Sequence, residues 1–209
     1  MILWFASGNF HKKRELSDIF SYNSSNFKAL VRIPAEAGIE FAPEETGNTF
    51  IENALIKATA LYRLLEESLP DGYTNGDTII ADDSGICVDA LNGRPGIHSA
   101  YYGGAKLEAS ERNALLLAEI GVNPARSAHF VCAMVLYYGP DRFFIAQETL
   151  EGELVKCVEF ARGSGGFGYD PILLIPELGR TVAELDPDEK NRLSHRGKAG
   201  RAIGRMLCY

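Results

Sequence analysis

The segment from Thr78 to Ala100, TIIADDSGICVDALNGRPGIHSA, constrains this chain most, because an apolar, β-branched run leads directly into the adjacent aspartates Asp82 and Asp83. We expect residues 78–81 to form a buried strand with the acids at its C-terminal end, where open α/β sheets commonly place ligand sites. Adjacent carboxylates repel each other and are costly to desolvate. The segment therefore indicates a metal or base-catalysis site, or else a solvated Asx turn.

Two more carboxylates favour the first interpretation. Glu44 and Glu45 precede a predicted helix that begins after Thr49, in a segment free to fold back over the end of the strand. Oxygen-only ligands favour Mg²⁺ or Mn²⁺ over zinc. Which of the two glutamates would bind the ion is left open, since they are adjacent.

The remaining pattern predicts an α/β domain around a mixed sheet, because strands and helices alternate early and strands cluster in the middle. A capping box, Thr49-x-x-Glu52, begins one helix, and Gly121 ends another. A length of 209 residues suits one domain with two lobes as well as two domains. The expected strands are 2–6, 78–81, 128–138, 143–149 and 151–160, and the expected helices follow residue 9 and cover 49–65, 107–121 and about 188–207.

Composition excludes some functions. The net charge of −7 argues against a general nucleic-acid binder, and no apolar run approaches the roughly 20 residues that span a bilayer. The first ten residues lack the basic leader and cleavage site of a secretory signal, so we expect a cytoplasmic protein. The segment from Lys190 to Arg205 contains six basic side chains and no acidic one, which suggests that a small polyanion binds there.

Two lysines are candidate phosphate ligands. The turn Ser7-Gly8-Asn9 is followed by Lys12 in the first turn of a predicted helix, where backbone N–H groups and a lysine together suit a phosphate. An ordinary β-α turn is the alternative. Lys57 is expected at the edge of the apolar stripe of its helix, either reaching into a cleft or only extending along the surface.

A glycine cluster holds two aromatic residues. In GSGGFGYDP, residues 163–171, the backbone can approach a ligand closely and Phe167 or Tyr169 can stack on a nucleobase. Downstream, Lys190, His195 and Arg196 offer donors for phosphate and base edges near one helix start. A tight loop with core aromatics, and a plain basic helix face, are the alternatives.

Together these motifs resemble the inosine triphosphate pyrophosphatase family, which hydrolyses non-standard purine nucleoside triphosphates such as ITP, dITP and XTP. The resemblance covers residues 7–198. It rests on SGNFHKKRE, EETGNTFIENALIKA, ADDSGICVDALNGRPGIHSA, GSGGFGYDPILLIP and AELDPDEKNRLSHRGKA, in this order.

The resemblance implies a single α/β domain over residues 1–209, with an elongated mixed sheet flanked by helices, two lobes and a central active-site cleft, assembled as a homodimer. It implies Mg²⁺ bound by Glu44 and Asp83, with Asp83 also the general base. It implies substrate contacts from Ser7, Gly8, Asn9, Phe10, His11, Lys12, Lys57, Ser84, Phe167, Gly168, Tyr169, Asp170, Lys190, His195 and Arg196.

We therefore expect an enzyme in which Asp82 and Asp83 hold Mg²⁺ and Asp83 takes a proton from the attacking water, releasing nucleoside monophosphate and diphosphate. Donors such as the Arg196 guanidinium would face the 6-keto oxygen of hypoxanthine or xanthine and reject the amino group of adenine. Two alternatives remain: a pyrophosphatase for modified pyrimidine nucleotides, and a nucleotide sensor without catalysis.

Overall fold

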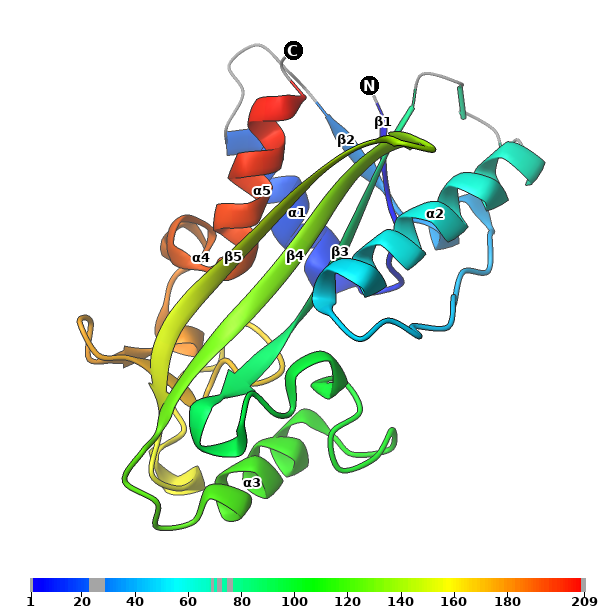
Figure 1. Ribbon diagram of the computed structural model, residues 1–209. Helices are drawn as coiled ribbons and strands as arrows, with labels where there is room; N and C mark the ends of the chain where they lie inside the picture. The colour runs from blue at the N-terminus through cyan, green and yellow to red at the C-terminus, as the bar shows by residue number, and fades with distance from the viewer. Residues whose placement is uncertain (1, 23–28, 69, 71–72, 75–76, 208–209) are drawn as a thin grey trace. The chain divides into compact units, whose positions relative to one another are not determined.

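The computed structural model describes residues 2–22, 29–68, 70, 73–74 and 77–207, and within them the chain forms a mixed seven-stranded sheet with α-helices beside it (Figure 1). The strand order is β2-β1-β3-β4-β5-β6-β7. The strands are β1 Ile2–Phe5, β2 Leu30–Arg32, β3 Thr78–Val88, β4 Ser127–Gly139, β5 Arg142–Leu154, β6 Leu173–Ile175 and β7 Arg180–Thr181. The α-helices of the described residues are α1 Phe10–Tyr22, α2 Phe50–Ser68, α3 Ala109–Ile120, α4 Pro187–Leu193 and α5 His195–Met206.

The chain divides into two compact units, and β3, β4 and β5 contribute residues to both. The first unit contains residues 1–83, 132–148 and 196–209, and the second contains residues 84–131 and 149–195. This division passes through β3 between Asp83 and Ser84. The expectation of a single domain with a cleft between two lobes stays a prediction.

In the first unit, β1 pairs in parallel with both β2 and β3, and helices cover both faces of these strands. α1 and α5 lie together on one face, where the Cβ position of Gly200 is 3.0 Å from Ile19, and α2 lies on the other (Figure 1). Parallel strands need such cover because both of their faces are apolar. Leu3, Phe5 and Ile80 accordingly form one buried cluster with side chains from α1 and α5.

The start of α2 confirms the predicted capping box. The backbone N–H of Glu52 donates to Thr49 Oγ1 at 3.1 Å, and that of Thr49 donates to Glu52 Oε2 at 3.2 Å. These reciprocal bonds satisfy donors that the first helical turn leaves without partners. One face of α2 contains Phe50, Ala54 and Leu61, all of which are buried.

In the second unit, the glycine-proline loop packs on the second half of β3. A Cβ at Gly85 would lie 2.4 Å from both Gly96 O and Ser99 Oγ, so only glycine permits this approach. Ser99 Oγ accepts the backbone N–H of Ile86 at 2.9 Å, and Tyr169 Oη donates to Ser99 O at 2.8 Å. The loop is thereby fixed to β3 and to the segment that carries Tyr169.

Three predicted boundaries are wrong. β3 continues beyond Ala81 to Val88, because Ile86 and Val88 bury their side chains in the core of the second unit. The two strands predicted at 143–149 and 151–160 are one strand, β5, followed by the 3₁₀ turn Val158–Phe160. The predicted helix 188–207 is two helices, because Ser194 has an extended backbone with ψ 157°.

Gly152 lies in β5 at the point where β6 approaches. A Cβ there would be 2.5 Å from Leu174 O, so glycine permits this approach. The mixed α/β fold expected from the sequence is confirmed in its order of strands and helices. No helix among the described residues has the length and apolar character needed to span a membrane.

Candidate functional site

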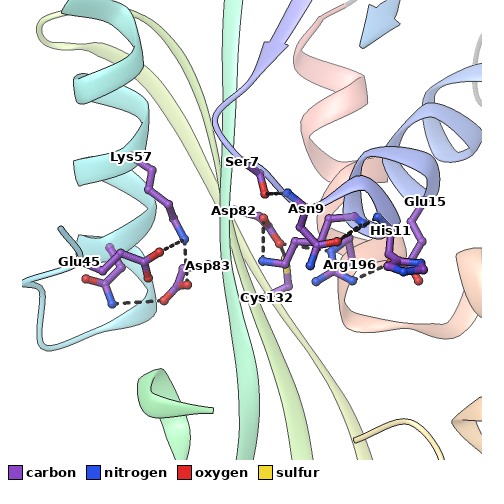
Figure 2. Close-up of polar contacts among 12 residues, drawn as sticks. Ser7, Asn9, His11, Glu15, Glu45, Lys57, Asp82, Asp83, Cys132 and Arg196 are labelled. Carbon is purple, nitrogen blue, oxygen red and sulfur yellow. Dashed lines mark hydrogen bonds and ion pairs between the residues drawn. The ribbon is translucent and has the colours of Figure 1, made fainter. Parts of the chain in front are cut away.

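Asp82 and Asp83 point to opposite faces of β3, both within the first unit (Figure 2). Successive residues of a strand alternate between faces, and the strand continues through both acids. Asp82 faces α1 and α5, and Asp83 faces α2 (Figures 1 and 2). The prediction that Asp82 and Asp83 together hold one Mg²⁺ is therefore wrong. Both acids lie inside β3 and not in a turn after it, so their side chains point to opposite faces.

Asp82 is the centre of a buried ionic network. Its Oδ1 accepts Lys12 Nζ at 3.0 Å, and its Oδ2 accepts Arg196 Nε at 3.2 Å. Arg196 Nη1 donates in turn to Glu15 Oε2 at 2.6 Å. Burial alone would raise the pKa of Asp82, but the charges of Lys12 and Arg196 outweigh it and hold the pKa far below its ordinary value. Asp82 is thus a fixed anion that joins α1 to α5.

Asp83 has a different environment. Its Oδ1 accepts Lys57 Nζ at 3.0 Å, and its Oδ2 accepts Asn53 Nδ2 at 3.3 Å. Burial raises the pKa of Asp83 above its ordinary value although Lys57 opposes the change. A carboxylate with a raised pKa is a better proton acceptor, which suits a general base.

Lys57 lies between two carboxylates. Besides Asp83, its Nζ contacts Glu45 Oε1 at 3.2 Å (Figure 2). Burial lowers the pKa of Lys57, but Asp83, Asp82 and Glu45 outweigh it and raise the pKa, so the ammonium keeps its charge. Glu44, the predicted metal ligand, and Glu45 are both exposed, and Glu45 is the one that contacts the ammonium.

The turn before α1 is organised by its own side chains. Asn9 Oδ1 accepts the backbone N–H groups of His11 at 2.9 Å and Lys12 at 3.1 Å, and Ser7 Oγ accepts that of Asn9 at 3.1 Å. Asn9 is therefore the N-cap of α1. This capping directs Lys12 toward Asp82, while the side chain of Phe10 is exposed.

The predicted base-binding residues other than Arg196 lie in the second unit. Asp170 Oδ2 accepts the backbone N–H of Phe167 at 2.7 Å and Lys190 Nζ at 2.9 Å. Lys190 Nζ also lies 5.0 Å from the centre of the Phe167 ring, a cation–π distance. The structure thus brings together Phe167, Asp170 and Lys190, three of the substrate contacts that the family resemblance implies.

Other predicted residues have structural partners. His195 is buried and stacks on Phe130 with 4.8 Å between ring centres, and Tyr169 is held by its bond to Ser99. Ser84 is half-buried at the start of the second unit. The structure thus groups one set of predicted residues around Asp82 and Asp83 and another around Asp170, each inside its own unit.

The donor set around Asp83 fits a hard divalent cation. Among the described residues no three His, Cys, Asp or Glu side chains gather into a ready-made metal site. Mg²⁺, however, is usually held by one or two carboxylates together with waters and substrate phosphates. Asp83 and Glu45 already converge on one cationic group, the Lys57 ammonium, and together they leave an excess of one negative charge.

The sequence analysis missed four residues of these clusters. Glu15 and Cys132 contact the Asp82 network, and Asn53 contacts Asp83. In the second unit, Asn113 Nδ2 donates to Gly168 O at 3.1 Å. A signal existed for both asparagines, since each occupies a buried position on its helix, where an amide is uncommon. Glu15 and Cys132 gave no such signal.

The fold and these clusters define an α/β protein with a mixed sheet, two compact units, and two carboxylates of one strand that pair with lysines from α1 and α2. The Ham1 family model matches residues 3–206. The chain belongs to the Ham1 family.

Relatives over the full length agree with this assignment. A dITP/XTP pyrophosphatase of Treponema denticola is 44% identical over 99% of this chain and 98% of its own, and one of Geobacillus kaustophilus is 40% identical over 93% and 88%. Among solved structures, a HAM1 protein from Coxiella burnetii has a TM-score of 0.82 at 33% identity, covering 100% of this chain and 98% of its own. The resemblance drawn from the sequence motifs is confirmed.

Proposed function

We propose that this protein hydrolyses non-standard purine nucleoside triphosphates, namely dITP, ITP and XTP, to the nucleoside monophosphate and diphosphate. Membership of the Ham1 family and the names of its relatives support this activity. The observation that carries the chemistry is Asp83, a buried carboxylate bound to Lys57 and Asn53. The acidic net charge supports a single nucleotide and not a nucleic acid as the ligand, and we place the activity in the cytoplasm.

Asp83 acts as the general base. The amide of Asn53 and the ammonium of Lys57 hold its two oxygens in place, and burial raises its affinity for a proton. A positioned base of this kind contributes about 10²–10⁴-fold to a hydrolysis rate. Asp83 takes a proton from water as the water attacks phosphorus, and the anhydride bond between the α- and β-phosphates breaks to release nucleoside monophosphate and diphosphate.

The phosphates bind to the lysines and to the turn before α1. Lys12 and Lys57 carry the positive charges, and Ser7, Gly8, Asn9, Phe10 and His11 contribute the turn and its N–H groups. The positive end of the helix dipole at the start of α1 adds to this attraction. In this structure Lys12 and Lys57 form ion pairs with carboxylates, so contacts with the substrate phosphates replace part of these ion pairs when substrate binds.

Asp83 and one glutamate, Glu44 or Glu45, hold Mg²⁺, for which Mn²⁺ can substitute. The contact between Glu45 and Lys57 supports Glu45, and the family resemblance supports Glu44. When bound, the ion neutralises triphosphate charge and lowers the pKa of a nearby water.

The base is proposed to bind at the segment from Phe167 to Asp170, where Asp170 accepts the backbone N–H of Phe167. Phe167 stacks on the ring, while Ser84, Gly168, Tyr169, Asp170, Lys190 and His195 form the remaining contacts. Arg196 is proposed to recognise the 6-keto group, although Glu15 and Asp82 engage two of its nitrogens. A pocket of donors leaves the amino group of adenine without an acceptor, at a cost of about 1–3 kcal/mol.

A homodimer forms through the first half of β5. Phe143, Phe144 and Ile145 are 41%, 47% and 38% exposed, an unusual run on one strand. Among the described residues β6 pairs with β5 only at Glu153 and Leu154. On the side of β5 away from β4, residues 142–148 therefore have no strand pairing among the described residues. A twofold axis at Ile145 would place Arg142 of one copy opposite Glu148 of the other, so this strand is complementary to itself.

Diphosphate release tests the function directly. We expect fast release from dITP, ITP and XTP with Mg²⁺, little from ATP, GTP or dUTP, and none with chelator. Fast release from dUTP alone would indicate a pyrimidine enzyme. Binding of dITP without release in any metal would contradict catalysis and indicate a sensor.

A further inference from the structure

Asn113 is an amide at a position that the helical pattern assigns to an apolar side chain. It shares the core-facing stripe of α3 with Leu116, Leu117 and Ile120, all of which are buried. Asn113 itself is 5% exposed. A buried amide needs both an acceptor for its N–H groups and a donor for its oxygen.

Only one of these needs is met. Nδ2 donates to Gly168 O at 3.1 Å, but among the described residues no donor reaches the buried Oδ1. A leucine here would pack with its neighbours and leave no unpaired oxygen. The unpaired Oδ1 therefore opposes folding, and among the described residues the hydrogen bond that the amide contributes in return is the one from Nδ2 to Gly168 O.

Gly168 lies at a point of the loop that has room to move. Its backbone is left-handed, with φ +64°, and a Cβ there would meet no atom within 4 Å. A cavity of about 250 Å³ extends between the start of α3 and residues 164–168. The bond from Asn113 crosses from the helix to this loop and limits its movement into the cavity.

The other side of the loop is held by different contacts. Asp170 binds Phe167 N and Lys190, and Gly165 N donates to Ala183 O at 3.1 Å. Asn113, from α3, adds a hydrogen bond at Gly168, which lies between the contacts of Gly165 and those of Asp170.

We propose that Asn113 is a positioning residue that fixes the loop of Phe167 and Gly168 in the conformation that receives the purine. This inference rests on the proposed function, in which that loop binds the base. Because the base is remote from the reacting phosphorus, loss of the bond weakens ground state and transition state alike. KM then rises while kcat is unchanged.

Two substitutions separate the bond from packing. Asn113→Leu fills the space of the amide and Asn113→Ala empties it, but both remove the bond to Gly168. Ser110→Ala is the matched control, because Ser110 lines the same cavity from the same helix and is exposed. The measurements are amide hydrogen exchange of residues 163–170, thermal unfolding, KM and kcat for dITP, and inhibition constants of inosine and tripolyphosphate.

We expect both Asn113 variants to exchange faster in the loop and to raise the KM for dITP and the inhibition constant of inosine roughly tenfold, the size of one hydrogen bond. The inhibition constant of tripolyphosphate and kcat should stay within about twofold, and the leucine variant should unfold no earlier than the wild type. Ser110→Ala should match the wild type throughout.

Unchanged loop exchange and KM in both variants would overturn the inference. A lower unfolding temperature in both variants, with reduced kcat and unchanged KM, would also overturn it, since that result describes a purely structural residue. If the wild type releases no diphosphate from dITP, the proposed function fails instead. Hydrogen exchange in the loop then decides alone whether Asn113 positions it.

Discussion

At the scale of single residues, one strand gives two adjacent aspartates different chemistry. Asp82 is bound by two cationic side chains and its pKa is lowered, whereas Asp83 has one cation and its pKa is raised by burial. A lowered pKa means that the charged form of Asp82 stabilises the folded state, and a raised pKa means the reverse for Asp83. The two acids should therefore respond differently to neutralisation.

Asp83→Asn should reduce kcat for dITP about 10²–10⁴-fold, because it removes a base but keeps the side-chain shape. It should cost less stability than Asp82→Asn, because Lys57 keeps its contact with Glu45. Asp82→Asn is the matched comparison and should lower the free energy of unfolding by about 3–5 kcal/mol, because it breaks a buried ion pair. Denaturant unfolding and steady-state kinetics on both variants check this. Full activity in Asp83→Asn would remove that residue from the mechanism.

Cys132 should be unreactive in the folded protein. Burial and then the nearby Asp82 raise the pKa of its thiol to about 12. At pH 8 roughly one thiol in 10⁴ is therefore ionised, and thiolate is the reactive form. Alkylation at pH 8 followed by peptide mapping should modify Cys132 only after denaturation; rapid labelling of the native protein would contradict the buried position.

At the scale of elements, the sequence predicted helix caps better than the lengths of strands. The capping box at Thr49 and the C-cap at Gly121 rest on bonds within a few residues, so local sequence was sufficient. The length of β3 and the continuity of β5 depend on strands that are distant in sequence. The same limit applies to the site: residue types predicted Asp83 and Lys57, but the opposite orientation of Asp82 required the register of the sheet.

Gly85→Ala should lower the free energy of unfolding by about 1–3 kcal/mol, because a Cβ would meet Gly96 O and Ser99 Oγ at 2.4 Å and the backbone oxygen cannot rotate away. Gly8→Ala is the control, since a Cβ there meets no atom within 4 Å. Urea unfolding of both variants provides the comparison. An equal cost at the two glycines would show that the close packing of the glycine-proline loop is not maintained in solution.

At the scale of the whole molecule, the family and the general fold followed from the order of motifs along the chain, whereas assembly did not. The exposed run on β5 gave no signal in the sequence, because Phe143, Phe144 and Ile145 are equally compatible with a buried strand. Only the pairing register shows that, among the described residues, β6 pairs with Glu153 and Leu154 of β5 and not with residues 142–148.

Charge reversal tests the proposed dimer. Arg142→Glu and Glu148→Arg should each weaken association, because each puts like charges opposite one another across the twofold axis, and the double variant should restore it. Ile145→Lys should give monomer at micromolar concentration. Sedimentation velocity on the wild type and four variants measures this. A monomeric wild type, or a double variant no better than the single ones, would exclude this interface.

The alternation of Asp82 and Asp83 along β3 also bears on how such a chain can change through evolution. Inserting or deleting one residue between Ile80 and Asp82 would turn every following side chain to the other face, so Asp82 would point toward α2 and Asp83 toward α1 and α5. Substitutions in this strand alter one contact at a time, but a change of length alters them all at once. We therefore expect the spacing of this segment to be kept more strictly than its residues.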